Sequence, residues 1–206
     1  NLKDGVLATF AVVEFEKMDP IAFITQSGAV GTFTYRLMNE LGLGYQYSVS
    51  TGNEAGVDFF DYVKYFSRQK EIKAIGGYLE GARNFDKMNE AIELCQLNDK
   101  PFVLMKVGTS EKGAQAATSH TASLAGNASI YSSYFKKKNV IQVNDEEELI
   151  DTLTLFTKAK ISPQRGGVAL VTTSGGAGII MTDRCEENEI QLAELTPKTR
   201  SKLKDI

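Results

Sequence analysis

Short apolar runs alternate with stretches of helical periodicity along this chain. Residues 21–25 (Ile-Ala-Phe-Ile-Thr) form a run typical of a buried strand, and the apolar positions after Ser27 and Gly28 recur at helical spacing. The same pairing then repeats. The predicted strands are residues 21–25, 45–51, 74–79, 101–107 and 140–143, and the predicted helices are residues 29–41, 57–66, 85–97, 128–138 and 146–158. Strands with little polar alternation, separated by helices, predict a parallel sheet covered on both faces.

The pattern restarts after residues 161–167, a Pro- and Gly-containing stretch typical of a linker. We predict strands at residues 168–172 and 191–195, a helix opening at Ser174-Gly175-Gly176, and a last helix after Pro197. The turn at residues 172–178 (Thr-Thr-Ser-Gly-Gly-Ala-Gly) echoes the turn at residues 25–31 (Thr-Gln-Ser-Gly-Ala-Val-Gly). The chain therefore looks like two copies of one α/β unit, of which the second has only two strands and is incomplete here.

Three domain ranges follow from this division. Residues 1–20 would be a lead-in from a preceding domain, residues 21–160 the first α/β domain, and residues 161–206 the start of the second. The first residue is Asn rather than Met, which indicates a piece of a longer protein.

Composition narrows the class of protein. The chain has 206 residues, of which 42 % are apolar and 24 % charged, and its formal net charge is −3. These values are ordinary for a globular protein and indicate no nucleic-acid partner. No apolar run approaches the roughly 18 residues of a spanning helix, and no basic-then-apolar leader is present. We therefore expect no membrane partner and a cytoplasmic location.

Cysteine usage gives no sign of a disulfide scaffold or a metal site. Cys95 and Cys185 are far apart and lack the spacing of metal ligands. Cys95 follows an apolar-periodic stretch and is predicted to be a small core residue rather than a nucleophile.

The segment Ser27, Gly28, Ala29 and Val30 follows a strand and opens a helix. Free amides at a helix N-terminus, small side chains and the helix dipole make such a place suitable for an anion such as phosphate. The alternative is a tight strand-to-helix turn that simply needs glycine. No GxGxxG fingerprint is present, and Gly108 and Gly113 have Walker A spacing but are followed by Ala114 instead of lysine. The chain therefore has no nucleotide-binding loop of its own.

His120 is the only histidine, and it lies in a tract of small residues. A neutral imidazole nitrogen is available as a nucleophile near neutral pH, and small neighbours leave room for a bound group. Gly108, Ser119, Thr121 and Gly126 are the residues expected to support this loop. The GxSxG motif of a serine hydrolase is absent from the sequence. A solvent-exposed polar histidine is the alternative interpretation.

Glu80 closes the apolar run at residues 74–79. A glutamate at a strand end can accept the N–H of one imidazole nitrogen, which leaves the other nitrogen free to attack. Ligands of parallel sheets collect beyond the carboxyl ends of the strands. Four segments fall there: Gln26-Ser27-Gly28, Gly52-Asn53-Glu54, Glu80-Gly81 and the His120 tract. An ordinary exposed acid at a strand end is the alternative.

Taken together, these motifs resemble the NDP-forming acyl-CoA synthetases, the family of ADP-forming acetyl-CoA synthetase and of the succinyl-CoA synthetase alpha subunit. The resemblance spans residues 19–195. It rests on residues 26–31 (Gln-Ser-Gly-Ala-Val-Gly), 51–53 (Thr-Gly-Asn), 78–81 (Tyr-Leu-Glu-Gly), 106–111 (Lys-Val-Gly-Thr-Ser-Glu), 119–121 (Ser-His-Thr), 124–126 (Leu-Ala-Gly) and 174–176 (Ser-Gly-Gly). It implies two flavodoxin-like parallel-sheet units.

The resemblance also implies an activity, an acid-thiol ligase that proceeds through an acyl phosphate and a phosphohistidine. His120 would be the phosphorylated residue, Glu80 would orient it, and residues 27–30 would hold its phosphate. Coenzyme A and ADP/ATP or GDP/GTP with Mg²⁺ would be bound mainly by CoA-binding and ATP-grasp domains outside this chain. The assembled enzyme would be an oligomer, and this fragment alone would be inactive.

Two other functions stay open at this point. One is a non-catalytic CoA-synthetase-like module attached to an acetyltransferase, which would act as a regulatory or binding domain. Such a module has no chemical need for either His120 or Glu80. A plain flavodoxin-like domain that binds a small molecule would carry no acid-labile phosphate.

Overall fold

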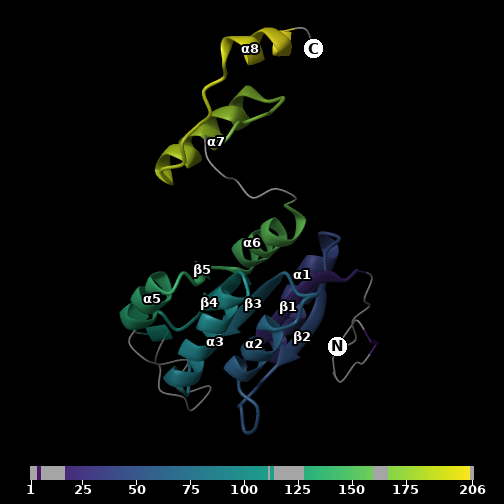
Figure 1. The fold of residues 1–206 in the computed structure, drawn as a ribbon, viewed down its shortest axis with the longest axis vertical. Coiled ribbons are helices and arrows are strands. Elements are labelled where there is room, and N and C mark those ends of the chain that lie inside the picture. The colour runs from purple at the N-terminus through teal and green to yellow at the C-terminus, as the bar shows by residue number, and fades with distance from the viewer. Residues whose placement is uncertain (1–3, 6–16, 111, 114–127, 160–166, 205–206) are drawn as a thin grey trace. The chain divides into compact units, whose positions relative to one another are not determined.

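The computed structural model describes residues 4–5, 17–110, 112–113, 128–159 and 167–204. The chain divides into two compact units, Asn1–Ala159 and Lys160–Ile206, which are described separately below. The first unit contains a five-stranded, all-parallel sheet in the order β2-β1-β3-β4-β5, as Figure 1 shows. The strands are β1 (Asp19–Thr25), β2 (Tyr45–Ser50), β3 (Ala74–Leu79), β4 (Phe102–Lys106) and β5 (Ile141–Val143). The α/β fold predicted from the alternating pattern is confirmed.

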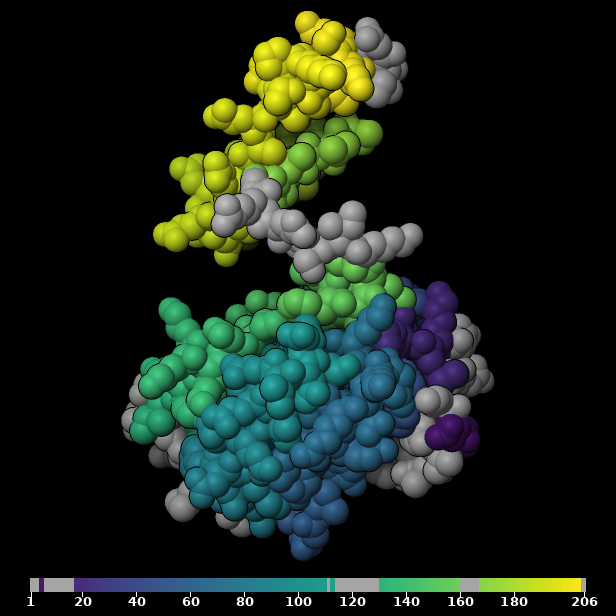
Figure 2. Space-filling view, in the orientation of Figure 1, coloured from purple at the N-terminus to yellow at the C-terminus, as the bar shows by residue number. Residues whose placement is uncertain are grey.

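Helices cover both faces of this sheet. They are α1 (Gly28–Glu40), α2 (Phe59–Ser67), α3 (Phe85–Leu97), α5 (Ala128–Lys137) and α6 (Glu146–Lys158). Helices α1 and α6 share one buried apolar cluster with the sheet, and α2, α3 and α5 share the other. In the space-filling view, the blue and teal atoms of α2 and α3 cover the face of the first unit that is turned to the viewer (Figure 2).

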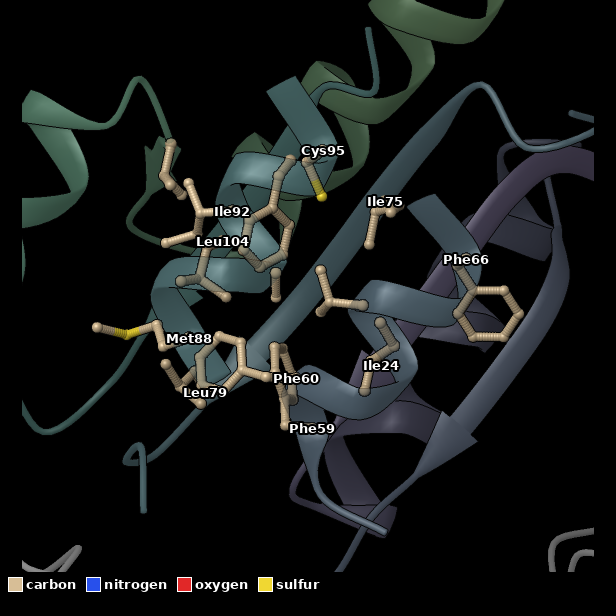
Figure 3. Packing of buried hydrophobic residues seen from close by; sticks show 14 of the residues in the cluster. Ile24, Phe59, Phe60, Phe66, Ile75, Leu79, Met88, Ile92, Cys95 and Leu104 are labelled. Carbon is tan, nitrogen blue, oxygen red and sulfur yellow. The ribbon is translucent and has the colours of Figure 1, made fainter. Parts of the chain in front are cut away.

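The core has two layers because the strands are apolar on both sides. Ile24, Ile75 and Leu104 come from three neighbouring strands and belong to one buried cluster with Phe59 of α2 and Met88 of α3 (Figure 3). On the other face, the buried members of the second cluster are Ile21, Phe23, Tyr35, Met38, Tyr45, Ala74, Val103, Met105, Val143, Leu149, Ile150 and Leu153. Burial of this kind stabilises by about 25 cal/mol per Å² of apolar surface.

Local sequence sets where the helices begin. Ser27, Asp58, Asn84 and Asp145 are the N-cap residues of α1, α2, α3 and α6, and each side chain accepts a hydrogen bond from the backbone N–H three residues later. Such caps satisfy amides that a helix cannot pair internally, and each stabilises by about 1 kcal/mol.

The second unit contains α7 (Gly175–Glu187) and α8 (Pro197–Lys204). The strands predicted at residues 168–172 and 191–195 are wrong: the described residues of this unit form only an isolated parallel bridge between Val168 and Leu192. Val171, expected inside a strand, is 92 % exposed. Two short segments without a third strand or a covering helix on each face bury too little apolar surface to extend the pairing.

Within the described residues, no helix is both long and apolar enough to cross a membrane.

Candidate functional site

The carboxyl ends of the parallel strands bring four loop segments to one edge of the sheet. These segments are Gln26 with Ser27 after β1, Thr51 to Glu54 after β2, Glu80 to Ala82 after β3, and Val107 with Gly108 after β4. Hydrogen bonds join the first three segments to one another and to the end of β4. This edge is where open α/β sheets bind ligands.

Ser27 caps α1 and shapes the turn before it. Its Oγ accepts a hydrogen bond from the Val30 backbone N–H at 3.4 Å, and Thr25 Oγ1 accepts from Ser27 N at 3.0 Å and donates to Ser27 O at 2.8 Å. Gly31 is required because a Cβ there would lie 2.9 Å from Thr25 Cγ2. Residues 28–30 thus form the first turn of a helix whose dipole and amides favour an anion.

The second unit repeats this turn almost atom for atom. Ser174 caps α7 with φ −114° and ψ 120°, against −112° and 119° at Ser27. Its Oγ accepts from Ala177 N at 3.4 Å, and Thr172 Oγ1 accepts from Ser174 N at 3.0 Å. Ser174, Gly175 and Gly176 are all exposed. The sequence echo therefore corresponds to the same local geometry in each unit.

Glu80 follows β3 directly and is buried, with 6 % of its surface exposed. Side chains from three other parts of the chain hold the backbone around it. Gln26 Oε1 accepts from Glu80 N at 2.6 Å and from Gly81 N at 3.1 Å, and Lys106 Nζ donates to Glu80 O at 2.8 Å. Tyr131 Oη accepts from Ala82 N at 3.1 Å. Because Gln26 also precedes Ser27, the start of α1 and the Glu80 segment are neighbours.

Lys106 ends β4 and points into this segment rather than into solvent. Its ammonium also donates to Val107 O and lies 4.9 Å from the centre of the Tyr131 ring. Burial lowers the pKa of Lys106 from its usual 10.5 to about 8, because desolvation penalises the charged form more than the nearby Glu80 carboxylate stabilises it.

Glu54 is a second buried carboxylate at the same edge, with only 3 % of its side chain exposed. Its Oε1 accepts from Gln26 Nε2 at 2.8 Å, from Thr51 Oγ1 at 3.2 Å and from Phe59 N at 3.1 Å. The half-exposed Arg83 places its Nε 3.8 Å from Glu54 Oε2. The Glu54 carboxylate is therefore paired and hydrogen-bonded, as a buried charge must be.

His120, Ser119, Thr121 and Gly126 lie outside the described residues. Gly108, the other residue expected to support the loop, has a φ of +70°, which glycine adopts without strain. Lys106 and Tyr131, which flank this stretch on either side in the sequence, both bond to the Glu80–Ala82 segment.

Among the described residues, no group of three or more His, Cys, Asp or Glu side chains could hold a metal ion.

The sequence places Gln26 and Glu54 at the carboxyl edge of the sheet, because both follow predicted strands, but it assigns no role to Lys106 or Tyr131. Lys106 lies near the end of the predicted strand at residues 101–107, which was a usable signal. Tyr131 carries no such signal, because nothing in a helical pattern shows which tyrosine reaches a distant strand end.

The fold and this edge define a flavodoxin-like α/β domain with a polar site at the carboxyl ends of its strands. The family model described as the succinyl-CoA ligase like flavodoxin domain matches residues 19–156. The chain belongs to this family.

Curated relatives extend the similarity over the whole chain. It is 36 % identical over 207 residues to the ADP-forming acetate–CoA ligase II subunit alpha of Pyrococcus furiosus and 35 % identical over 206 residues to the ADP-forming acetate–CoA ligase I of Archaeoglobus fulgidus. Both matches cover 100 % of the chain but only 44 % and 29 % of those proteins. The chain thus spans less than half the length of either relative.

Solved structures are similar to this chain over most of its length. The apo form of the dinucleotide-forming acetyl-coenzyme A synthetase 1 of Ca. Korarchaeum cryptofilum superposes with a TM-score of 0.85 at 30 % identity, over 97 % of this chain and 43 % of that one. The same enzyme in complex with phosphate and ADP gives a TM-score of 0.81 at 32 % identity, over 92 % of this chain and 40 % of that one.

Proposed function

We propose that this chain is the ligase core of an ADP-forming acyl-CoA synthetase in which His120 carries a phosphoryl group. The observation that carries the proposal is that side chains from three distant parts of the chain bond to the backbone beside Glu80. Residues on both sides of the His120 stretch, Lys106 and Tyr131, bond to the Glu80–Ala82 backbone, and Gln26 joins that backbone to the capped start of α1. A buried carboxylate, a helix start suited to an anion and the only histidine of the chain are thereby assigned to one edge of the sheet.

The chemistry requires three transfers. Phosphate attacks the acyl carbonyl of an acyl-CoA, the C–S bond breaks, and the thiol of CoA leaves with a proton. An imidazole nitrogen of His120 then attacks the phosphorus of the acyl phosphate, and the carboxylate leaves. Finally an oxygen of the terminal phosphate of ADP attacks the same phosphorus, which forms ATP and returns the neutral imidazole.

Each residue has a physical role in these steps. Glu80 would accept the N–H of one imidazole nitrogen, which sets the tautomer and stabilises the positive charge that forms as the other nitrogen attacks. The amides of residues 28–30 would hold the phosphoryl oxygens without reorganisation. The exposed turn at Ser174, Gly175 and Gly176 has the same geometry and is proposed as a second anion-binding helix start.

The remaining parts of the reaction are assigned to domains outside this chain. CoA and ADP/ATP, or GDP/GTP, with Mg²⁺ would be held mainly by CoA-binding and ATP-grasp domains in the same protein or in a partner subunit, within an oligomer. Two observations support this division: the relatives are more than twice as long as the chain, and one solved neighbour is in complex with phosphate and ADP. Mg²⁺ would offset the charge of the nucleotide phosphates.

A non-catalytic regulatory module of an acetyltransferase fits less well. The curated relatives over the whole chain are named as ADP-forming acetate–CoA ligases. A module without phosphoryl transfer would also have no reason to bury Glu80 and hold its backbone with three side chains.

The test is phosphorylation of the whole protein. The protein is incubated with ATP labelled on its γ-phosphate and Mg²⁺, and the protein-bound label is followed through acid and base. We expect an acid-labile, base-stable phosphate that is absent from His120→Ala and His120→Asn, while Glu80→Gln folds normally and is labelled slowly. Undiminished labelling of both His120 variants would overturn the assignment.

A further inference from the structure

The side chain of Gln26 uses its full hydrogen-bonding capacity to join two turns. Its Oε1 accepts from Glu80 N at 2.6 Å and Gly81 N at 3.1 Å, while its Nε2 donates to Gly81 O at 2.9 Å and Glu54 Oε1 at 2.8 Å. A carboxamide has two acceptor and two donor sites, and all four are occupied here. We propose that Gln26, held by Glu54, is a positioning residue that sets the Glu80 carboxylate for His120; this inference rests on the proposed function.

Side chains from other parts of the chain hold the segment that follows β3. Five successive backbone groups bond to side chains: Glu80 N, Glu80 O, Gly81 N, Gly81 O and Ala82 N. Gln26 binds three of these groups, Lys106 one and Tyr131 one. The chain has left the ladder of β3 at this point, so these side chains, and above all Gln26, decide the direction in which Glu80 leaves the strand.

Glu54 contributes to the direction in which the Gln26 amide faces. Two acceptors, the Glu54 carboxylate and Gly81 O, face Nε2 of Gln26, and two donors, the amides of Glu80 and Gly81, face Oε1, so the amide has one favoured orientation. Glu54 is itself held by Thr51 Oγ1 and Phe59 N, and its backbone lies in the left-handed region with a φ of 53°. A non-glycine residue in this conformation costs free energy, so the contacts around Glu54 must offset that cost.

The second unit shows that the turn itself does not need glutamine. Thr173 occupies the position of Gln26, yet the capped turn at Ser174 has the same dihedral angles and the same side-chain hydrogen bonds as the turn at Ser27. The long amide at residue 26 is therefore not required to start α1. What it adds is the connection to Glu80, Gly81 and Glu54.

The principal variant is Gln26→Thr, which copies the residue that the chain already accepts in the equivalent turn. Gln26→Met keeps the length of the side chain and removes its hydrogen bonds, so it serves as a second variant if Gln26→Thr unfolds. The matched control is Gln69→Thr just beyond the carboxyl end of α2, where the amide bonds only to Tyr65 O among the contacts of the described residues. We expect phosphorylation of His120 in the whole protein to slow on the order of a hundredfold in both Gln26 variants, as for a misplaced catalytic group, and to be unchanged in the control.

A double-mutant cycle separates positioning from general loss of structure. If Gln26 acts through Glu80, then Gln26→Thr combined with Glu80→Gln is labelled no more slowly than Glu80→Gln alone. If the Gln26 substitution slows labelling by the same factor whether or not Glu80 is present, the proposed positioning role is wrong.

Amide hydrogen exchange provides a readout that does not depend on phosphoryl transfer. In both Gln26 variants the amides of Glu80 and Gly81 are expected to exchange faster, while amides within β3 keep their protection. Unchanged exchange at Glu80 and Gly81 would overturn the inference even if His120 is phosphorylated. Conversely, failure of the His120 variants to lose the label would overturn the proposed function and leave the exchange result standing as a separate measurement.

Discussion

The ammonium of Lys106 lies 4.9 Å from the centre of the Tyr131 ring. One residue ends β4 and the other lies in the first turns of α5, so the two sides of the sequence stretch that carries His120 meet beside Glu80. A cation over an aromatic face is stabilised by about 0.5–2 kcal/mol. The contact thus joins a residue that precedes the candidate phosphohistidine segment to one that follows it, at the proposed site.

Lys106 predicts a pH dependence of stability. Its pKa is about 8 in the folded chain and near 10.5 when unfolded, so between these values the unfolded state binds more protons. The free energy of unfolding should therefore rise with pH between about 8 and 10.5. Below pH 8 Lys106 is charged in the folded chain as well, so the full cost of burying its ammonium lowers stability there. Urea unfolding at a series of pH values checks this, with Lys106→Met as the reference. A difference between the two proteins that stays constant across the window would contradict it.

Two substitutions of Ser27 distinguish its role as the N-cap of α1 from the proposed role of this helix start in holding phosphate. Ser27→Ala should lower the free energy of unfolding by about 1 kcal/mol because the Val30 amide loses its partner. Ser27→Asp should keep the cap, since aspartate is an equally good N-cap residue, but its charge should repel a phosphoryl group and slow labelling of His120. Normal labelling of Ser27→Asp would show that this helix start does not hold the phosphate.

Gly77 in the middle of β3 has no room for a side chain. A Cβ there would lie 2.6 Å from Phe59 Cζ and 2.9 Å from Leu104 Cδ1. We expect Gly77→Ala to lower the free energy of unfolding by about 1–3 kcal/mol through overpacking. Gly56→Ala is the control, because no atom lies within 4 Å of its added Cβ. Equal stability of the two variants would contradict the packing described for this face.

Cys95 should be unreactive in the folded protein. It is 2 % exposed, and desolvation by burial raises the pKa of its thiol to about 12. Since the thiolate is the reactive form, a disulfide reagent at pH 8 should not modify Cys95 until denaturant unfolds the chain. The measurement uses a protein in which Cys185 and any other cysteines are replaced by serine. Rapid modification under native conditions would disprove the burial.

The sequence by itself determined the elements of the first unit. The predicted strand at residues 74–79 and the predicted helices at 85–97 and 146–158 coincide with β3, α3 and α6. Apolar runs and helical periodicity report burial directly, and Ser, Asp and Asn before the periodic stretches act on amides only three residues away. The position of Glu80 at a strand end followed from the same local pattern.

Only the tertiary structure decided which side chains meet at the site. Gln26 reaches Glu80 across 54 positions of sequence and Tyr131 reaches Ala82 across 49, and periodicity carries no information about such crossings. The two strands predicted in the second unit failed for a related reason: a strand exists through its partners, and within the described residues Val168 finds only Leu192. Local chemistry sets the elements, whereas pairing and side-chain hydrogen bonds between distant segments depend on the assembled sheet.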